Sequence, residues 1–237
     1  MFHYSPPLPK PKASMMLSPI LAKIKEYTES VIANQFSCDL EHCPRCGKEA
    51  GAFKRHALRE RTFLVVEGEW VCKESSFLTR WKCLLCNDTF THYPAFAIPH
   101  KRYVQASIIA HAHNYLDEDR KTYRQAAQGD GRPIFFKGDS PETIDDRTLA
   151  PSTIHRWIVF LAGLGRTLRT ALRLIREKSP SADIFRRLFP VGAWKYRSLG
   201  RKHELEATLQ LIAVKASYQA LFGPSTFTEL ATACRWT

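Results

Sequence analysis

Apolar residues recur at helical intervals near the start of the chain. They are Ile20, Leu21, Ile24, Tyr27 and Val31. Ser18-Pro19 precedes them and is typical of a helix start, because a serine side chain caps the helix and proline suits its first position. The pattern predicts one amphipathic helix over 19–34, in an N-terminal helical region at 17–36 that follows a disordered, proline-rich lead at 1–16.

From 37 to 100 the chain is rich in cysteine, aromatic and β-branched residues. Two segments in this part, 61–72 and 77–84, have the composition of strands. Pro94 and Pro99 lie at the C-terminal end of this segment, where they interrupt regular secondary structure. The sequence therefore predicts a small β-rich domain over 37–100.

Helical spacing returns after Pro99 and continues for most of the remaining chain. The expected helices cover about 103–116, 120–128, 151–178 with a break at Gly163 or Gly165, and 201–222 ending at Gly223-Pro224. Between the second and third of them, residues 129–146 hold Gly-Asp turns, two prolines and the strand-like Pro133–Phe136. That composition predicts a loop or hairpin insert.

Charge and overall composition narrow the class of protein. The chain has 237 residues, 44% of them hydrophobic, which excludes wholesale disorder. Its longest apolar run, 157–165, is far shorter than the roughly 20 residues of a membrane span, and the N-terminus lacks the apolar core of a secretory signal. Both observations lead us to expect a cytoplasmic protein.

The net charge is +12, and residues 151–237 alone carry 14 basic and 5 acidic side chains. Such a block favours a polyanionic partner, most often nucleic acid, although a merely solvated basic face is the alternative.

Four of the seven cysteines form two pairs, Cys43-Pro-Arg-Cys46 and Cys83-Leu-Leu-Cys86, with 36 residues between them. Each Cys-x2-Cys pair directs two thiolates at one ion, and two pairs complete a closed tetrahedral site. The sequence predicts one structural Zn²⁺ on Cys43, Cys46, Cys83 and Cys86, which supplies folding free energy to a small β-rich module. It leaves open whether a nearby side chain replaces one of these ligands. The candidates are Cys38, His42, His56 and Cys72.

The surroundings of the two pairs carry a resemblance to a known family. His56 is followed by Arg59 and Arg61, and the second pair lies in the run Arg80–Thr91. This order resembles the zinc ribbon that opens many bacterial insertion-sequence transposases. The exit Phe96–Tyr103 resembles uncharacterised zinc-ribbon proteins of bacterial mobile elements, in which a helix-turn-helix follows the ribbon. The resemblance covers about 43–157. It implies DNA binding in a mobile-element setting, without a catalytic transposase domain.

A candidate helix-turn-helix occupies 101–165. Its first helix is Lys121–Ala127, and its recognition helix begins within Leu149–Trp157. On the second helix Ile154, Trp157, Ile158 and Leu161 share an inner face. The side chains left to face outward toward DNA are Ser152, Thr153, His155 and Arg156. The segment 128–148 replaces the usual short turn, and its role is open. The alternative is a core helix with a polar face.

The basic C-terminal region at 166–237 begins with a row of arginines. Arg166, Arg169, Arg173 and Arg176 fall at offsets 0, 3, 7 and 10, beside an apolar stripe that runs from Leu161 to Ile175. Such a row can follow a phosphate backbone, or it can be solvated or face an acidic protein. Four more basic residues near the helices are expected to contact DNA: Lys101, Arg102, Lys121 and Arg124.

Two shorter patterns follow the arginine row. Leu205, Leu209, Ile212, Ala216 and Ala220 form a stripe that suits core or self-association. The run Trp194–Arg197 interleaves aromatic residues with cations, which suits nucleic acid.

Catalytic patterns are weak. The chain beyond 150 has none of the long strands that an RNase-H-like transposase needs for its acidic triad. His111-Ala-His113 could serve a nuclease only on a strand, because the two side chains diverge by about 200° on a helix.

The sequence therefore predicts a mainly α protein with a small β zinc ribbon, in which a helix-turn-helix is followed by a C-terminal helical region. Its expected function is non-catalytic binding of double-stranded DNA at the nucleoid, with recruitment of a transposase or recombinase as a further role. A protein-interaction adaptor that uses the ribbon and an unrecognised nuclease or transposase are the alternatives. The target site and oligomeric state stay open.

Overall fold

The computed structural model describes residues 18–38, 40, 42–49, 53–138 and 144–223. The expected disordered lead at 1–16 and the chain beyond Gly223 lie outside the described residues. The helices and strands, in chain order, are α1 Pro19–Ile32, β1 Phe53–Glu67, β2 Trp70–Cys83, β3 Thr89–His92, α2 Gln105–Asp117, α3 Tyr123–Ala126, β4 Gln128–Gly129, β5 Arg132–Pro133, β6 Phe135–Lys137, β7 Ile144–Thr148, α4 Pro151–Ala162, α5 Gly165–Lys178 and α6 Leu199–Phe222.

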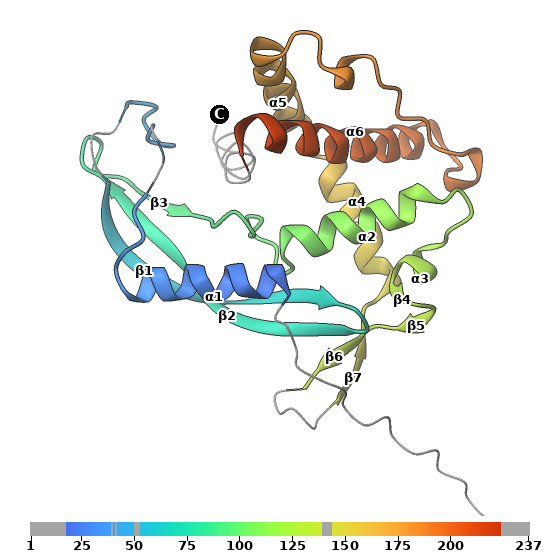
Figure 1. Ribbon diagram of the computed structural model, residues 1–237, viewed down its shortest axis with the longest axis horizontal. Helices are drawn as coiled ribbons and strands as arrows, with labels where there is room; N and C mark the ends of the chain where they lie inside the picture. Colours follow the sequence, from blue (N-terminus) through green and yellow to red (C-terminus); the bar gives the residue numbers. More distant parts are fainter. Residues whose placement is uncertain (1–17, 39, 41, 50–52, 139–143, 224–237) are drawn as a thin grey trace, which may run out of the picture.

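The longest strands, β1 and β2, form one curved antiparallel hairpin (Figure 1). Its two-residue turn is Gly68-Glu69, where Gly68 takes a left-handed backbone conformation with φ 55°. The strand expected over 61–72 is therefore wrong, because it runs across this turn. The sequence did not predict that residues 54–60 are part of this strand. Nearly all of their side chains are exposed, so the segment lacks the alternation of buried and exposed positions that is typical of a half-buried strand.

The sheet has five strands and is mixed. Its order is β1-β2-β6-β7, and β3 also pairs with β2. Strand β6 runs parallel to β2, with Phe135 opposite Trp70, and β7 pairs antiparallel with β6. The segment expected as a loop or hairpin insert thus holds a small hairpin, in which β4 pairs with β5, while its strands β6 and β7 extend the main sheet. The chain is 45% helical and 24% strand, so the expected mainly α class is wrong.

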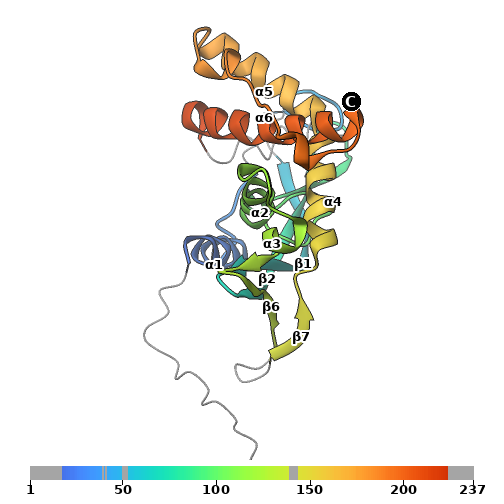
Figure 2. The same ribbon diagram turned by 90° about the vertical axis from the view of Figure 1, so that its right-hand side faces the viewer.

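The core has two parts, one on each face of the hairpin. Because side chains alternate across a strand, Phe63 and Val65 of β1 pack in one cluster with Ile24 of α1, whereas Leu64 packs in the other. The second cluster is larger and joins α2, α4, α5 and α6, which stack on one side of the hairpin (Figures 1 and 2). The sheet therefore carries a small helical layer on one face and the main helical layer on the other.

Several helix boundaries agree with the sequence signals. Ser18 caps α1 by accepting the backbone N–H of Leu21 at 3.4 Å. The expected break separates α4 from α5 at Gly163, and α6 ends at Gly223, where φ is 87°. The stripe expected on α6 is confirmed as core at Leu205, Leu209 and Ile212, which pack in the larger cluster, but is wrong at Ala216 and Ala220, which are exposed. The helix buries Leu205, Thr208, Leu211, Val214 and Tyr218.

Candidate metal centre and basic surfaces

The two Cys-x2-Cys pairs lie in two turns of the same construction. In the first, Cys43 N–H donates to Lys48 O at 3.0 Å, and Gly47 N–H donates back to Cys43 O at 2.8 Å. In the second, Cys83 N–H donates to Asp88 O at 2.9 Å, and Asn87 N–H donates to Cys83 O at 3.0 Å. Gly47 and Asn87 both have a left-handed backbone, with φ near 67° and 62°. Glycine and asparagine tolerate this conformation best, so each turn suits its local sequence.

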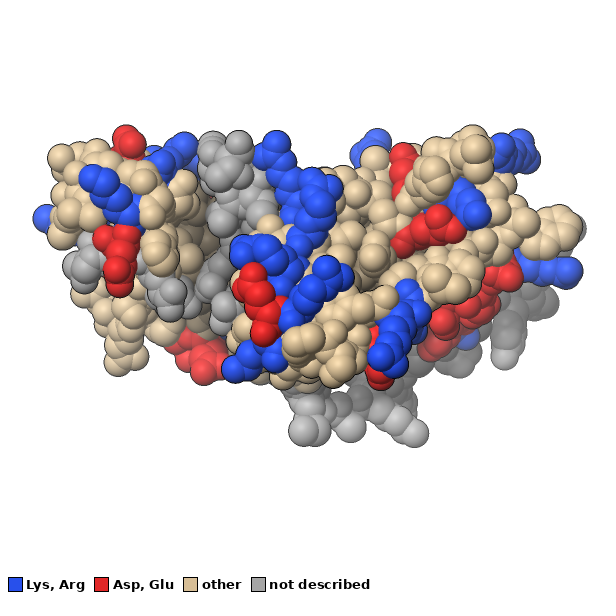
Figure 3. Space-filling model, turned by 90° about the horizontal axis from the view of Figure 1, so that it is seen from above, with Lys and Arg blue, Asp and Glu red and all other residues tan. Residues whose placement is uncertain are grey.

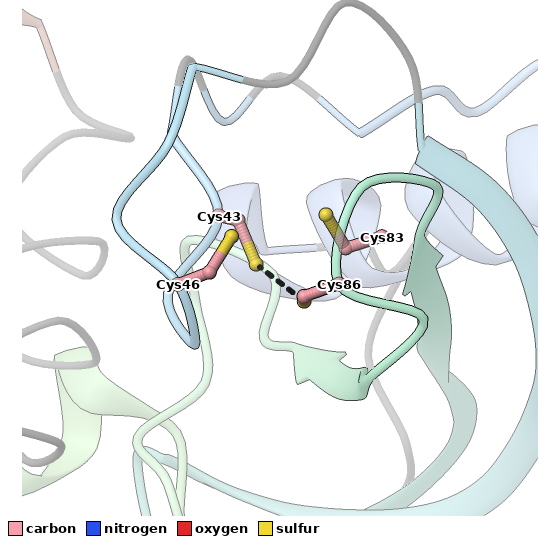
Figure 4. A group of neighbouring side chains, drawn as sticks. All are labelled: Cys43, Cys46, Cys83 and Cys86. Atoms are coloured by element: carbon pink, nitrogen blue, oxygen red, sulfur yellow. Dashed lines mark hydrogen bonds between the residues drawn. The ribbon is translucent and has the colours of Figure 1, made fainter.

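The four thiols gather between these turns (Figure 4). Their sulfur atoms all lie within 4.8 Å of one another, and the Sγ atoms of Cys43 and Cys86 are 3.9 Å apart. Sulfur atoms around a tetrahedral ion with bonds of about 2.3 Å lie about 3.8 Å apart. Cys43 and Cys83 are buried, while Cys46 and Cys86 are half-buried. The cluster can therefore hold a metal ion with little rearrangement.

The environment of the thiols favours one thiolate. The backbone N–H groups of Cys86 and Leu85, together with two neighbouring thiols, lower the pKa of Cys83 to about 7, although burial opposes them. At Cys86 the backbone N–H of Asp88 lowers the pKa, but burial and the other thiols outweigh it and raise that pKa to about 12. Four thiols this close cannot all ionise without a cation among them.

The four cysteines expected as ligands are thus brought together. Within the described residues, none of the four alternative ligands joins the cluster, which contains Cys43, Cys46, Cys83 and Cys86 alone. His56 is exposed on β1. Cys72 is half-buried in β2, where burial raises the pKa of its thiol.

The inner and outer faces of α4 are as the spacing predicts. Ile154, Trp157, Ile158 and Leu161 are buried. Ser152, His155 and Arg156 are exposed, and Thr153 is half-buried. The helix before α4 is shorter than expected, since α3 is a single turn, Tyr123–Ala126, closed by a capping box between Thr122 and Gln125. Tyr123 contacts His155 edge-on at 5.6 Å between ring centroids, so α3 packs against the start of α4.

The four arginines of α5 are all exposed. Seen from above, lysine and arginine side chains gather over this helix (Figure 3). Arg173 pairs with Glu177 at 3.1 Å, and the Arg176 guanidinium lies 4.7 Å from the centre of the Phe185 ring. Thr167, Ala171 and Ile175 form the buried face of the helix.

The other four basic candidates differ in their surroundings. Arg102 and Arg124 are exposed. The Lys101 ammonium lies 4.3 Å from the centre of the Phe160 ring. Lys121 is largely covered and donates to Asn114 Oδ1 and Glu118 Oε1, each at 2.6 Å. Its charge is therefore committed to neighbouring side chains.

Lys195 lies in the run Trp194–Arg197 that suits nucleic acid, but it is only 8% exposed. Its ammonium donates to the carbonyls of Tyr115 and Lys121, so it closes the carboxyl end of α2. The sequence gives no sign of this role, because the acceptor carbonyls are about 80 residues away along the chain.

His111 and His113 lie on α2, as the helical spacing predicts. His111 is half-buried and its Nδ1 is 2.8 Å from Ala126 O, whereas His113 is exposed. Burial lowers the pKa of His111. The neutral ring therefore donates from Nδ1 to the carbonyl and ties α2 to α3.

A groove that the sequence analysis did not assign lies beside the first cysteine turn. Its volume is about 350 Å³. Four arginines line it: Arg45, Arg59, Arg61 and Arg80. Arg59 and Arg61 lie two residues apart, which places their side chains on one face once residues 53–60 are known to be strand.

None of the helices in the described part of the chain has the length and apolarity needed to cross a bilayer. No family model, curated protein or solved structure matches this chain. The functional assignment therefore depends on the chemistry of the residues described above.

Proposed function

We propose that this chain is a non-catalytic DNA-binding protein that is stabilised by one structural Zn²⁺. The observation that carries the proposal is the arginine row on α5, Arg166, Arg169, Arg173 and Arg176, all exposed on one helix. At about 1.5 Å per residue, the row extends roughly 15 Å. One strand of a duplex has a phosphate about every 3.4 Å along its axis, so the row is as long as four to five phosphates.

The contacts that the arginines already make are easily exchanged. The Arg173–Glu177 pair is exposed on both sides, and such pairs contribute about 0–1 kcal/mol. A phosphate offers a guanidinium two acceptor oxygens and a stronger charge-assisted bond. Arg166 and Arg169 make no ion pair within the described residues.

Helix α4 is the proposed sequence-reading element. Its buried face fixes the helix on α2, α3 and α6, while Ser152, His155 and Arg156 near its start remain exposed. Residues at the start of a recognition helix are the ones that reach base edges in the major groove. Arginine can bind guanine through two hydrogen bonds, so Arg156 is the strongest candidate for reading a base.

Zinc is the proposed metal because four cysteine thiolates are its usual structural ligand set. Bound there, it would tie the turn around Cys43 to the turn around Cys83 at the end of the β1–β2 hairpin. Four thiolates leave no coordination position for a reactive water, which suits a structural and not a catalytic role.

The resemblance of residues 43–157 to mobile-element zinc-ribbon proteins supports a setting at bacterial DNA. In that setting the protein would act in the cytoplasm at the nucleoid, where it could recruit a transposase or recombinase to its site. A gene for such an enzyme beside the gene of this protein would support the proposal.

The test is the salt dependence of binding to a duplex oligonucleotide. Replacing Arg169 and Arg173 together with Gln removes two phosphate contacts. The slope of log affinity against log salt should become shallower by about 1.8, from roughly 0.9 per contact. The matched control replaces Lys23 and Lys25, exposed on α1, with Gln. An unchanged slope in the α5 variant, with folding intact, would remove this helix from the DNA interface.

A second candidate function is protein binding, and one observation favours it. Leu84 and Leu85, at the tip of the second cysteine turn, are 54% and 58% exposed. Exposed apolar pairs of this kind suit a protein partner. Absence of DNA binding, together with loss of a partner from a Leu84→Ser/Leu85→Ser variant, would favour the adaptor.

A further inference from the structure

The four arginines of the groove beside the first cysteine turn come from three parts of the chain. Arg45 comes from the turn Cys43-Pro-Arg-Cys46, Arg59 and Arg61 come from β1, and Arg80 comes from β2. The groove is also lined by polar side chains of β3 and the following segment, Thr89, Thr91, Tyr93 and His100. Glu60 is the one carboxylate among the lining residues.

The strand register places three of the arginines on one face of the hairpin. Ala57 lies opposite Arg80, Arg59 opposite Leu78, and Arg61 opposite Ser76. Because opposite residues share a face and alternate positions return to it, Arg59, Arg61 and Arg80 project to the same side. The hairpin thus presents three guanidinium groups in one patch.

Among the described residues, no acidic side chain neutralises the charges of Arg59, Arg61 and Arg80. Arg61 donates to the carbonyl of Lys101 at 2.9 Å, and Arg80 donates to the Thr89 hydroxyl at 2.7 Å. Both acceptors are uncharged, and in the part of the chain that the structure describes Arg59, Arg61 and Arg80 form no ion pair. The groove therefore keeps a net positive charge, which attracts an anion.

We infer that this groove is a second DNA contact, which holds the phosphodiester backbone of a strand beside the metal site. The inference rests on the proposed DNA-binding function and names a surface separate from α5. Guanidinium groups bind phosphate oxygens in bidentate fashion, and the threonine and tyrosine hydroxyls add neutral donors. A groove of about 350 Å³ accommodates a short stretch of backbone.

The position of Arg45 couples this contact to the metal. Arg45 lies between two ligands, and its own backbone N–H is 3.4 Å from Cys43 Sγ. Loss of the ion leaves the turn without its cross-link and removes one wall of the groove. Removal of the metal should therefore weaken DNA binding at the groove while the arginines of α5 are still present.

The competing explanation is that the arginines balance the charge of the metal site. A divalent ion with four thiolates carries a net charge of −2, and Arg45 is part of that site. In this case the arginines would retain the metal and make no contribution to DNA binding. The two explanations differ in what is lost when Arg59 and Arg80 change.

The experiment compares the full-length, metal-loaded protein with Arg59→Gln/Arg80→Gln, using a fluorescent random duplex and metal analysis of each preparation. The salt slope should become shallower by about 1.8. Between 50 and 200 mM salt, the wild type should therefore lose about 12-fold more affinity than the variant. Arg59→Lys/Arg80→Lys should keep most of the slope, because the charge remains. A variant that combines Arg59→Gln/Arg80→Gln with the Gln substitutions of Arg169 and Arg173 should have a salt slope that is shallower by about 3.6, if the two surfaces act independently.

The outcomes separate the two proposals. A wild-type protein that does not bind DNA contradicts the proposed function. A groove variant with the wild-type slope, beside an α5 variant whose slope is shallower, overturns the groove inference alone. Loss of metal from the Gln variant assigns the arginines to the metal site and likewise overturns it. Retained metal, a shallower slope and an unchanged Lys23→Gln/Lys25→Gln control support it.

Discussion

Lys195 offers a sharp test of how the helical layer is held together. Its ammonium is buried beneath the end of α2, donates to Tyr115 O, donates to Lys121 O at 2.8 Å, and lies 4.0 Å from the centre of the Tyr115 ring. Burial lowers the pKa of this lysine, and the nearby Asp119 carboxylate opposes that shift. Lys195→Met keeps a similar apolar stem and removes the charge and all of its hydrogen bonds.

The expected cost follows from the carbonyls that lose their donor. Each buried acceptor left without a partner costs about 1–3 kcal/mol, and the Lys121 carbonyl is only partly buried. Relief of the desolvated ammonium offsets part of this loss. We expect a net destabilisation of about 2 kcal/mol. For a chain of this size that corresponds to a fall in Tm of about 4–8 °C.

The assay is thermal unfolding of the metal-loaded protein, followed by circular dichroism. Lys202→Met is the matched control, because the Lys202 ammonium makes two weak contacts, a long pair with Glu206 at 3.7 Å and a distance of 5.9 Å to the centre of the Tyr196 ring. Its effect should stay within about 0.5 kcal/mol. If Lys195→Met changed the Tm as little as the control does, the hydrogen bonds of the ammonium would not be stabilising the end of α2.

Three further predictions concern the site and its supports. His111 is half-buried and neutral with its pKa lowered, so its contribution to stability is complete above the unfolded value of about 6.5 and is lost as pH falls toward the lower folded value. His111→Gln should flatten unfolding curves measured between pH 7 and 5 relative to wild type, and parallel curves would contradict this. Gly47→Ala places a side chain at φ 67° and should weaken metal binding about 5- to 30-fold in a competition titration, from a strain of about 1–2 kcal/mol, whereas Asn87→Gly at φ 62° should not weaken it. Arg156→Ala should reduce affinity for a selected duplex by about 1–3 kcal/mol more than for random DNA; equal losses would make Arg156 a phosphate contact only.

The cysteine cluster could be predicted from the sequence because metal chemistry limits the spacing of its ligands. A Cys-x2-Cys pair fits a tight turn, and the left-handed residues that close the two turns, Gly47 and Asn87, directly follow the second cysteine of each pair. The buried face of α4 and the break at Gly163 could also be predicted, since helical periodicity and glycine act locally.

The sheet could not be predicted in the same way. The first half of β1 is exposed on both faces, so its strand conformation depends on backbone pairing with β2 and leaves no apolar alternation. Phe135 enters the sheet by parallel pairing with Trp70, 65 residues earlier, which no local pattern encodes. The basic groove could not be predicted for the same reason, because only the hairpin register shows that Arg59 and Arg80 project from the same face.

The salt dependence of wild-type binding to a random duplex, measured by fluorescence anisotropy with metal-loaded protein, tests the central claim most directly. Four arginines on α5 alone predict a log–log slope of about 3.6 in magnitude, and the groove should make it steeper. Chelation of the metal before the titration should weaken binding and make the slope shallower. Absence of binding at 50 mM salt, or an affinity that does not change with salt, would contradict DNA binding by this protein.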